Sequence, residues 1–149
     1  MLVYRVARAK YPALDGEGAR HYGGRWNSPG TALVYTASSI SLAVLETRVH
    51  LRAMPVDYVR FTIEISDSFR EVVTMSPASL GIGWQTDLRL TRKIGDLYFQ
   101  KYIDVPLKLK VPSVVIENEW NLLLTPAFAE LNARIVDWQP IGLDPRLWS

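Results

Sequence analysis

Glu46 lies on the apolar side of the most clearly helical segment of the chain. At about 100° per residue it falls about 40° from Leu42 and about 60° from Val49, two apolar positions at helical spacing. A carboxylate on such a face either gains hydrogen-bond donors or has its pKa shifted upward, because burial disfavours the charged form. Glu46 is therefore either a structural carboxylate, satisfied by Arg48, Arg52 or a backbone amide, or a site carboxylate that projects into a cleft.

Arg25 is a second candidate because it stands in the glycine-rich stretch Gly23-Gly24-Arg25-Trp26-Asn27. Glycines let the backbone approach a ligand closely, and the forked guanidinium suits phosphate or pyrophosphate. Trp26 could stack on a base or form the hydrophobic plug of the loop, and a loop arginine is often simply solvated. The glycines lack the strand-to-helix spacing of a Rossmann or P-loop motif.

Ser113 and Asn121 lie in the segment 111–124, where two apolar runs are separated by a polar turn. Ser113 is poorly supported as a nucleophile, because the G-x-S-x-G elbow is absent and only two histidines could serve as its base. Its alternative is a hydroxyl at a strand edge that bonds the backbone. Asn121 could bind a ligand or stabilise a turn.

The composition limits the chemistry that these residues can support. A chain of 149 residues with 48% hydrophobic and 21% charged residues predicts a single globular domain over 1–149. No cysteine and two histidines exclude disulfides, cysteine nucleophiles and thiolate zinc sites, and leave almost no transition-metal ligands. We therefore expect no metal site.

Charge and hydropathy suggest where the protein works. The net charge of +2 is small for a nucleic-acid binder. Residues 1–60 carry eight Lys and Arg against four Asp and Glu, so this part could face an anionic ligand. The sequence lacks both a signal-peptide pattern and an apolar run of about 18 residues, so we expect a soluble cytoplasmic protein that binds no membrane.

Periodicity predicts the elements that must position the candidates. Residues 58–65 alternate between apolar and polar side chains, as a half-buried strand does. Ser38 and Ser39 are good N-caps for a helix with apolar positions through Ala53, which Pro55 ends. We also expect a loop over 15–30, a helix over 87–102, and strands over 2–7, 32–36, 113–116, 120–124 and 134–138. The fold class predicted is α+β.

The ordered motifs of the chain resemble the RES domain family, toxins of bacterial toxin–antitoxin pairs named for an Arg, a Glu and a Ser. The matching segments are Tyr4-Arg5-Val6, Gly23-Gly24-Arg25-Trp26-Asn27 with Gly30, Val34-Tyr35-Thr36, Leu45-Glu46, Val111-Pro112-Ser113-Val114-Val115, Glu119-Trp120-Asn121-Leu122-Leu123 and Asp144-Pro145-Arg146-Leu147. They cover essentially the whole chain in the family's order.

The resemblance implies an ADP-ribosyltransferase-like core of short mixed strands in two small sheets, with flanking helices around a cleft that holds NAD+. It implies NAD+ as substrate, not as a prosthetic group, and cleavage of the nicotinamide–ribose bond. The implied catalytic residues are Glu46, Arg25, Tyr35 and Ser113. The implied NAD+-binding residues are Arg25, Trp26, Asn27, Tyr35, Ser113 and Asn121.

The resemblance also implies a partner, a helix-turn-helix antitoxin of the Xre type that joins the toxin in a hetero-oligomer and blocks its cleft, without direct nucleic-acid binding by the toxin. The chain departs from the family pattern at residues 125–128, where Thr-Pro-Ala-Phe replaces an expected Asn-Pro followed by His. The acceptor of the ADP-ribose therefore stays open among water, phosphate and a protein. A non-catalytic module that binds an anionic ligand is the alternative from another class.

Overall fold

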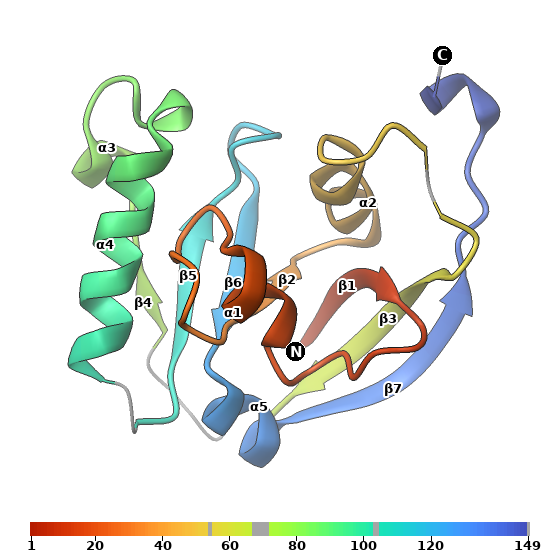
Figure 1. Ribbon diagram of the computed structural model, residues 1–149, viewed down its shortest axis with the longest axis horizontal. Helices are drawn as coiled ribbons and strands as arrows, with labels where there is room; N and C mark the ends of the chain where they lie inside the picture. The colour runs from red at the N-terminus through yellow and green to blue at the C-terminus, as the bar shows by residue number, and fades with distance from the viewer. Residues whose placement is uncertain (54, 67–71, 103–104, 149) are drawn as a thin grey trace.

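The protein is an α+β fold, as the sequence predicted (Figure 1). The computed structural model describes residues 1–53, 55–66, 72–102 and 105–148. The strands are β1 (Leu2–Arg8), β2 (Val34–Ala37), β3 (Tyr58–Ile65), β4 (Val73–Thr74), β5 (Lys108–Pro112), β6 (Trp120–Leu124) and β7 (Ala133–Pro140). The helices are α1 (Glu17–Tyr22), α2 (Ile40–Arg48), α3 (Pro77–Leu80), α4 (Leu88–Lys101) and α5 (Pro126–Asn132), with 3₁₀ turns η1 (Trp84–Thr86) and η2 (Pro145–Trp148).

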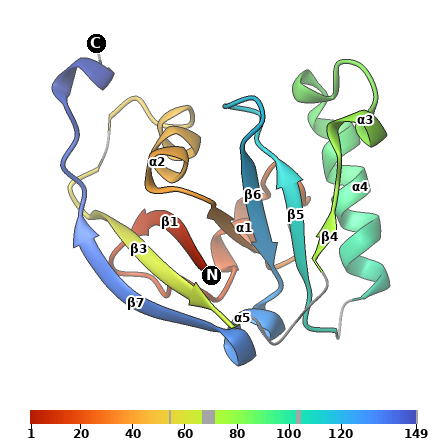
Figure 2. The ribbon, with the colours of Figure 1, turned by 180° about the vertical axis from the view of Figure 1, so that it is seen from behind.

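The described strands form a single sheet in the order β4-β5-β6-β2-β1-β3-β7, where we expected two small sheets. The reason for the difference is the junction of β1 with β2, which is registered at one pair only, Tyr4 with Ala37. On either side of it, longer ladders join β1 to β3 and β2 to β6. The sheet thus consists of two halves that diverge at the junction, as Figures 1 and 2 show from opposite sides.

A buried hydrophobic cluster holds the two halves together. It combines Val3 and Ile63 from one half with Val34 and Leu124 from the other, and Phe128 of α5 completes it. A second cluster lies between the sheet and α4 and includes Trp26 and Trp84. The third cluster is small and packs α2 against the sheet through three buried residues, Ala37, Leu42 and Ala43.

Several predicted elements have other bounds in the structure. The first serine-capped helix ends at Arg48 and does not continue to Ala53, so Val49 is 57% exposed and has no place on a buried face. Residues 113–116, predicted as a strand, follow β5 and form a turn, because β5 takes the preceding residues 108–112. The predicted loop over 15–30 contains α1.

Helix α5 (Pro126–Asn132) is an element that the sequence analysis did not predict. The side chain of Thr125 accepts a hydrogen bond from the Phe128 amide, and Pro126 occupies the first turn. A threonine N-cap followed by proline is a recognisable helix start. The Thr-Pro-Ala-Phe departure from the family pattern therefore has a structural role, since it begins α5 and buries Phe128 completely.

Candidate active site

Glu46 is held by two neutral side chains that reach it from the neighbouring strands. The Ser113 hydroxyl donates to its Oε1 at 2.6 Å, and the Asn121 amide donates to the same oxygen at 2.7 Å. Neither Arg48 nor Arg52, the cations proposed as partners for a structural carboxylate, bonds it within the described part of the chain. Its Oε2 receives no hydrogen bond from any described residue. The carboxylate is thus oriented by two uncharged donors.

The backbone fixes Ser113 in this position. Its Oγ accepts hydrogen bonds from the amides of Val115 and Ile116 at 3.0 and 3.1 Å, which closes the turn that follows β5. With both amides pointing at the oxygen, the hydroxyl hydrogen is free to donate to Glu46. Ser113 is 5% exposed. The hydroxyl therefore serves to orient the carboxylate.

Asn121 leaves a buried polar atom without a partner. Its amide nitrogen faces Glu46, whereas its Oδ1 is buried and accepts no hydrogen bond from a described residue. Leaving such an acceptor unsatisfied costs about 1–3 kcal/mol. Orphaned groups of this kind are tolerated mainly where function requires them.

Tyr35 supports the loop that carries Arg25. Its hydroxyl donates to Oδ1 of Asn27 at 2.6 Å and accepts from the amide of Trp26 at 2.9 Å. Burial raises the pKa of the Tyr35 phenol well above its usual value. A Cβ on Gly24 would come within 2.6 Å of this hydroxyl, which explains the glycine. Tyr35 and the loop therefore form one packed unit.

Trp26 and Asn27 lie inside this unit. Trp26 is 2% exposed and belongs to the cluster under α4, which is the hydrophobic-plug interpretation of this residue. Asn27 is fully buried, and its amide donates to the carbonyls of Ala19, Ser28 and Thr31. Trp26 is buried in the core and the Asn27 amide is hydrogen-bonded within the loop. Direct contact of either side chain with NAD+ stays a prediction.

Helix α4 forms the other support of the loop. Arg92 donates from Nε to the Gly24 carbonyl at 2.9 Å, and Asp96 accepts from the amide and hydroxyl of Ser28. Gly95 lets the helix approach so closely that a Cβ there would lie 1.7 Å from the Trp26 carbonyl oxygen. This packing is the reason for a glycine in the middle of α4.

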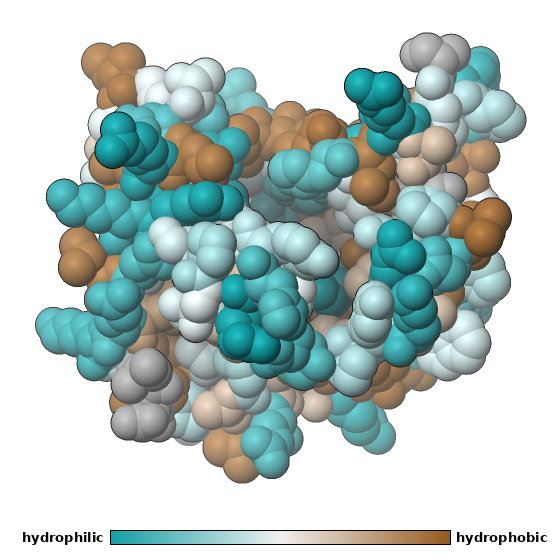
Figure 3. Space-filling model, viewed as in Figure 1, coloured by the Kyte–Doolittle hydropathy of each residue, from teal (hydrophilic) through white to brown (hydrophobic). Residues whose placement is uncertain are grey.

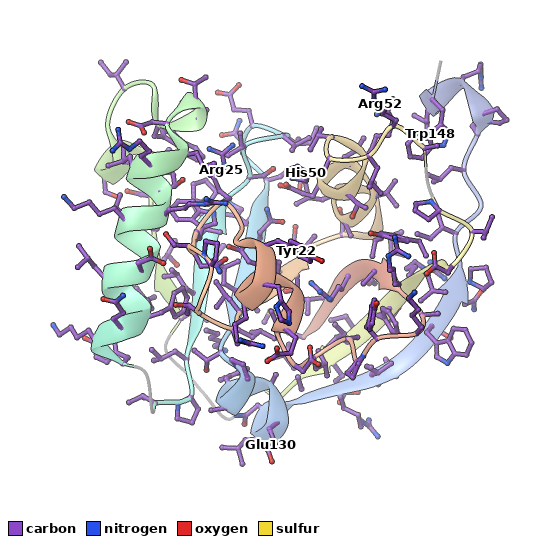
Figure 4. The ribbon with its side chains drawn as sticks, viewed as in Figure 1. Tyr22, Arg25, His50, Arg52, Glu130 and Trp148 are labelled. Carbon is purple, nitrogen blue, oxygen red and sulfur yellow. The ribbon has the colours of Figure 1, made fainter. Side chains whose placement is uncertain are left out.

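Arg25 itself is partly exposed and lies between α4 and β6 in Figure 4. One guanidinium nitrogen donates to the Gln85 carbonyl in η1 at 3.1 Å, which anchors the side chain and leaves other donors available. Figure 3 shows this face hollowed above α1 and beside α2. The hollow lies between the loop that carries Arg25 and helix α2, which carries Glu46.

Arg5 is a candidate that the sequence reasoning placed only within a family motif. It donates to the Tyr35 carbonyl at 3.0 Å, where β1 and β2 diverge, and its Nε is buried without a hydrogen-bond acceptor among the described residues. Burial lowers the pKa of its guanidinium, and the charge of Asp15 acts in the opposite direction. An arginine inside a strand flanked by Val3 and Ala7 was the available signal.

The structure thus brings Glu46, Ser113 and Asn121 into direct contact. Arg25, Trp26, Asn27 and Tyr35 form a separate group under α4, and no hydrogen bond joins the two groups within the described residues. The described residues contain no cluster of three or more His, Asp or Glu side chains that could hold a metal ion. None of the described helices has the length and apolar character needed to cross a membrane.

Residues 2–144 match the RES domain family. The chain belongs to the RES domain family. This RES domain is 37% identical over 155 residues to Toxin Res of Yersinia enterocolitica, with 99% of each chain covered. It is 33% identical to Toxin Res of Photorhabdus laumondii, covering 99% of this chain and 97% of that protein. The Prs ADP-ribosylating toxin of a Sphingobium species is 40% identical over 121 residues, covering 76% and 73%.

The fold of the RES domain is also found among solved structures. A chain of the Mycobacterium tuberculosis MbcT-MbcA toxin–antitoxin complex superposes with a TM-score of 0.72 at 22% sequence identity. The superposition covers 99% of the RES domain and 86% of that chain. This solved structure therefore shares the α+β fold of the RES domain.

Proposed function

We propose that this RES domain is the toxin of a toxin–antitoxin pair and that it consumes NAD+ by cleaving the bond between nicotinamide and ribose. The observation that carries the proposal is the Glu46 carboxylate, which two neutral donors orient without neutralising it. The names of its relatives support the toxin part of the proposal, since three are called Toxin Res, and the name of the Prs ADP-ribosylating toxin supports ADP-ribosyl chemistry.

Glu46 suits the electrostatic demand of this reaction. Loss of the cationic nicotinamide passes through an oxocarbenium-like state in which positive charge develops on the ribose. A carboxylate held in place stabilises that charge or activates the attacking nucleophile, and its orientation costs no reorganisation during the reaction. Ser113 and Asn121 provide that orientation through Oε1, so Oε2 is the oxygen that faces the substrate in this proposal.

Arg25 binds the pyrophosphate of NAD+ in this proposal. Its guanidinium is anchored by one bond to the Gln85 carbonyl, so the remaining donors are presented with a restricted orientation. Tyr35, Trp26 and Asn27 contribute by fixing the loop, and Tyr35 remains our candidate for contact with the nicotinamide side. Arg92 donates to the carbonyl of the neighbouring Gly24, so a second cation lies beside this loop and also favours an anionic ligand.

The acceptor of the ADP-ribose defines the finer alternatives. Water would make the enzyme an NAD+ glycohydrolase, inorganic phosphate would make it a phosphorylase, and a protein side chain would make it an ADP-ribosyltransferase. The relative named as an ADP-ribosylating toxin favours the last of these as the alternative to NAD+ degradation. A non-catalytic module that grips an anionic partner is the alternative outside enzymes.

The test is NAD+ consumption by the purified protein, with identification of the products, compared between wild type and Glu46→Gln. The amide oxygen of Gln can still accept from Ser113 and Asn121, so the variant keeps the local structure and removes the charge. We expect turnover to fall about 10²–10³-fold, the usual value of one preorganised electrostatic group. Label from NAD+ on a protein band identifies transfer, and free or phosphorylated ADP-ribose identifies the other acceptors.

Glu130→Gln serves as the matched control, because it makes the same substitution at an exposed carboxylate of α5, which Figure 4 shows at the edge of the molecule away from α2. It should consume NAD+ at the wild-type rate. Constant NAD+ with the wild-type protein, or full consumption by Glu46→Gln, contradicts the proposal. In cells we expect wild type to arrest growth and lower NAD+, and co-expression of a helix-turn-helix antitoxin to relieve the arrest.

A further inference from the structure

The buried apolar packing of helix α2 is confined to its first half. The buried residues are Leu42, Ala43 and Val44. Glu46 lies in the last turn, where the helix is only half-buried. Val49, the residue that follows the last helical residue Arg48, has a right-handed backbone conformation. The helix therefore lacks the left-handed glycine that commonly closes a helix. The turn that carries Glu46 is thus the part of α2 most liable to fray.

Arg48 connects this last turn to the C-terminal segment. Its Nε donates to the Leu147 carbonyl at 2.8 Å, and another nitrogen donates to the Leu51 carbonyl at 3.1 Å. The guanidinium lies over the ring of Trp148, 4.5 Å from its centroid. Figure 4 shows Trp148 on the side of α2 away from β6, and Figure 2 shows the chain returning there from β7.

The two sides of the last turn are therefore held differently. Glu46 and Arg48 are two residues apart, about 200° around the helix, so they project from opposite sides. On one side Ser113 and Asn121 bond the carboxylate, and on the other side η2 holds the guanidinium. Stacking on Trp148 adds a contribution of the cation–π type to this second attachment.

We propose that η2 is a latch that positions the catalytic carboxylate, with Trp148 and Arg48 acting as positioning residues for Glu46. The inference rests on the proposed function, in which Glu46 stabilises the reacting ribose. Without the latch the last turn of α2 frays, and Glu46 loses its fixed direction while the Arg25 loop, supported by α4, is unaffected. Because misplacement of a catalytic group by about 1 Å can cost about 10²-fold in rate, the effect appears in kcat and not in NAD+ binding.

The test compares Trp148→Ala, Trp148→Phe and Arg48→Lys with wild type, using NAD+ kinetics and hydrogen exchange of the full chain. Trp148→Ala should lower kcat at least about tenfold with KM for NAD+ changed less than about twofold. Amide exchange of residues 45–49 should accelerate, whereas that of α4 should not change. Trp148→Phe keeps a stacking ring and should recover most of kcat. Arg48→Lys keeps the charge but loses the planar fork, and should resemble Trp148→Ala.

Arg8→Ala is the matched control, since Arg8 also lies over an aromatic ring, that of Tyr58, and its partners Tyr58 and Asp57 lie outside both α2 and η2. A Trp148→Ala variant that matches Arg8→Ala in kcat and in exchange overturns the latch. A raised KM with general loss of thermal stability also overturns it, because that pattern indicates a structural role only.

Failure of the latch is distinguishable from failure of the proposed function. If Glu46→Gln is inactive while Trp148→Ala is fully active, the latch is wrong and the proposed function stands. If the wild-type protein leaves NAD+ unchanged, the proposed function is wrong and the exchange data decide the latch alone. Faster exchange of residues 45–49 then supports it, and unchanged exchange overturns it.

Discussion

Glu46 shows how one carboxylate can be fixed in direction without being neutralised. An arginine partner would fix it equally well. Its positive charge, however, would offset the negative charge with which the carboxylate stabilises a developing cation. Ser113 and Asn121 provide hydrogen bonds and no net charge, at the expense of an unsatisfied buried acceptor on Asn121. The sequence could locate the carboxylate by helical spacing. Helical spacing could not show that Ser113 and Asn121 donate to Glu46, because they lie 67 and 75 residues away in the sequence.

Tyr35 allows a prediction at the same scale, on the pH dependence of stability. An unfolded tyrosine ionises near pH 10, whereas burial raises the pKa of Tyr35 in the folded protein. The folded state therefore retains a proton that the unfolded state loses, and the free energy of unfolding falls as the pH rises above about 10. One such group contributes a slope of up to about 1.4 kcal/mol per pH unit.

We expect the fall between about pH 10 and 12 to be steeper for wild type than for Tyr35→Phe by up to this amount. The measurement is urea unfolding at a series of pH values. Tyr22→Phe is the control, because the Tyr22 ring is 83% exposed and should leave the slope unchanged. Equal slopes for wild type and Tyr35→Phe would show that the phenol is not sequestered.

At the scale of elements, α4 and the Arg25 loop act as one structure. In an exposed helix, Gly→Ala stabilises by about 1 kcal/mol. In α4 the sign reverses, because a Cβ on Gly95 would overlap the Trp26 carbonyl oxygen. We expect Gly95→Ala to destabilise by about 1–3 kcal/mol, the usual cost of overpacking, and to raise KM for NAD+ by displacing Arg25.

Gly18→Ala provides the matched control for this prediction. Gly18 lies in α1 with nothing within 4 Å of an added Cβ, so alanine there should stabilise the protein by about 0.4–1 kcal/mol. Thermal or urea unfolding of both variants gives the measurement. A Gly95→Ala protein as stable as wild type would mean that the contact of α4 with the loop is loose.

Elements with strong local signals were predictable from the sequence. The alternation over 58–65 matches β3, and the serine caps mark the start of α2. The strand predicted over 113–116 was wrong because Val114, Val115 and Ile116 are apolar and β-branched, and only the Ser113 hydroxyl reveals the turn that they form. Local propensity cannot distinguish these cases, since sheet pairing decides which residues become strand.

At the scale of the whole molecule, the sheet is continuous although it diverges at the β1–β2 junction. The resemblance implied two sheets. In the structure the single registered pair between β1 and β2 joins them into one sheet. Arg5 donates to a backbone carbonyl at this divergence. The junction has no sequence signature, because it depends on how two distant segments meet. An arginine inside a strand draws attention to Arg5, but the sequence does not show which carbonyl it bonds. The cluster that includes Phe128 spans both halves and should make them unfold together.

This cooperativity gives the last prediction, which also tests the single-domain expectation for residues 1–149. Amides of β3, in one half, and β6, in the other, should exchange through the same global unfolding, with free energies that agree within about 1 kcal/mol. Phe128→Ala should lower both by the same amount, about 3–5 kcal/mol, because its ring is fully buried in the shared cluster. Leu131→Ala on the same helix is the control, since Leu131 is 70% exposed and should change neither. A variant in which β3 loses protection while β6 keeps it would show that the halves are separate folding units, and Glu46 and Arg25 would then depend on different parts of the molecule for their stability.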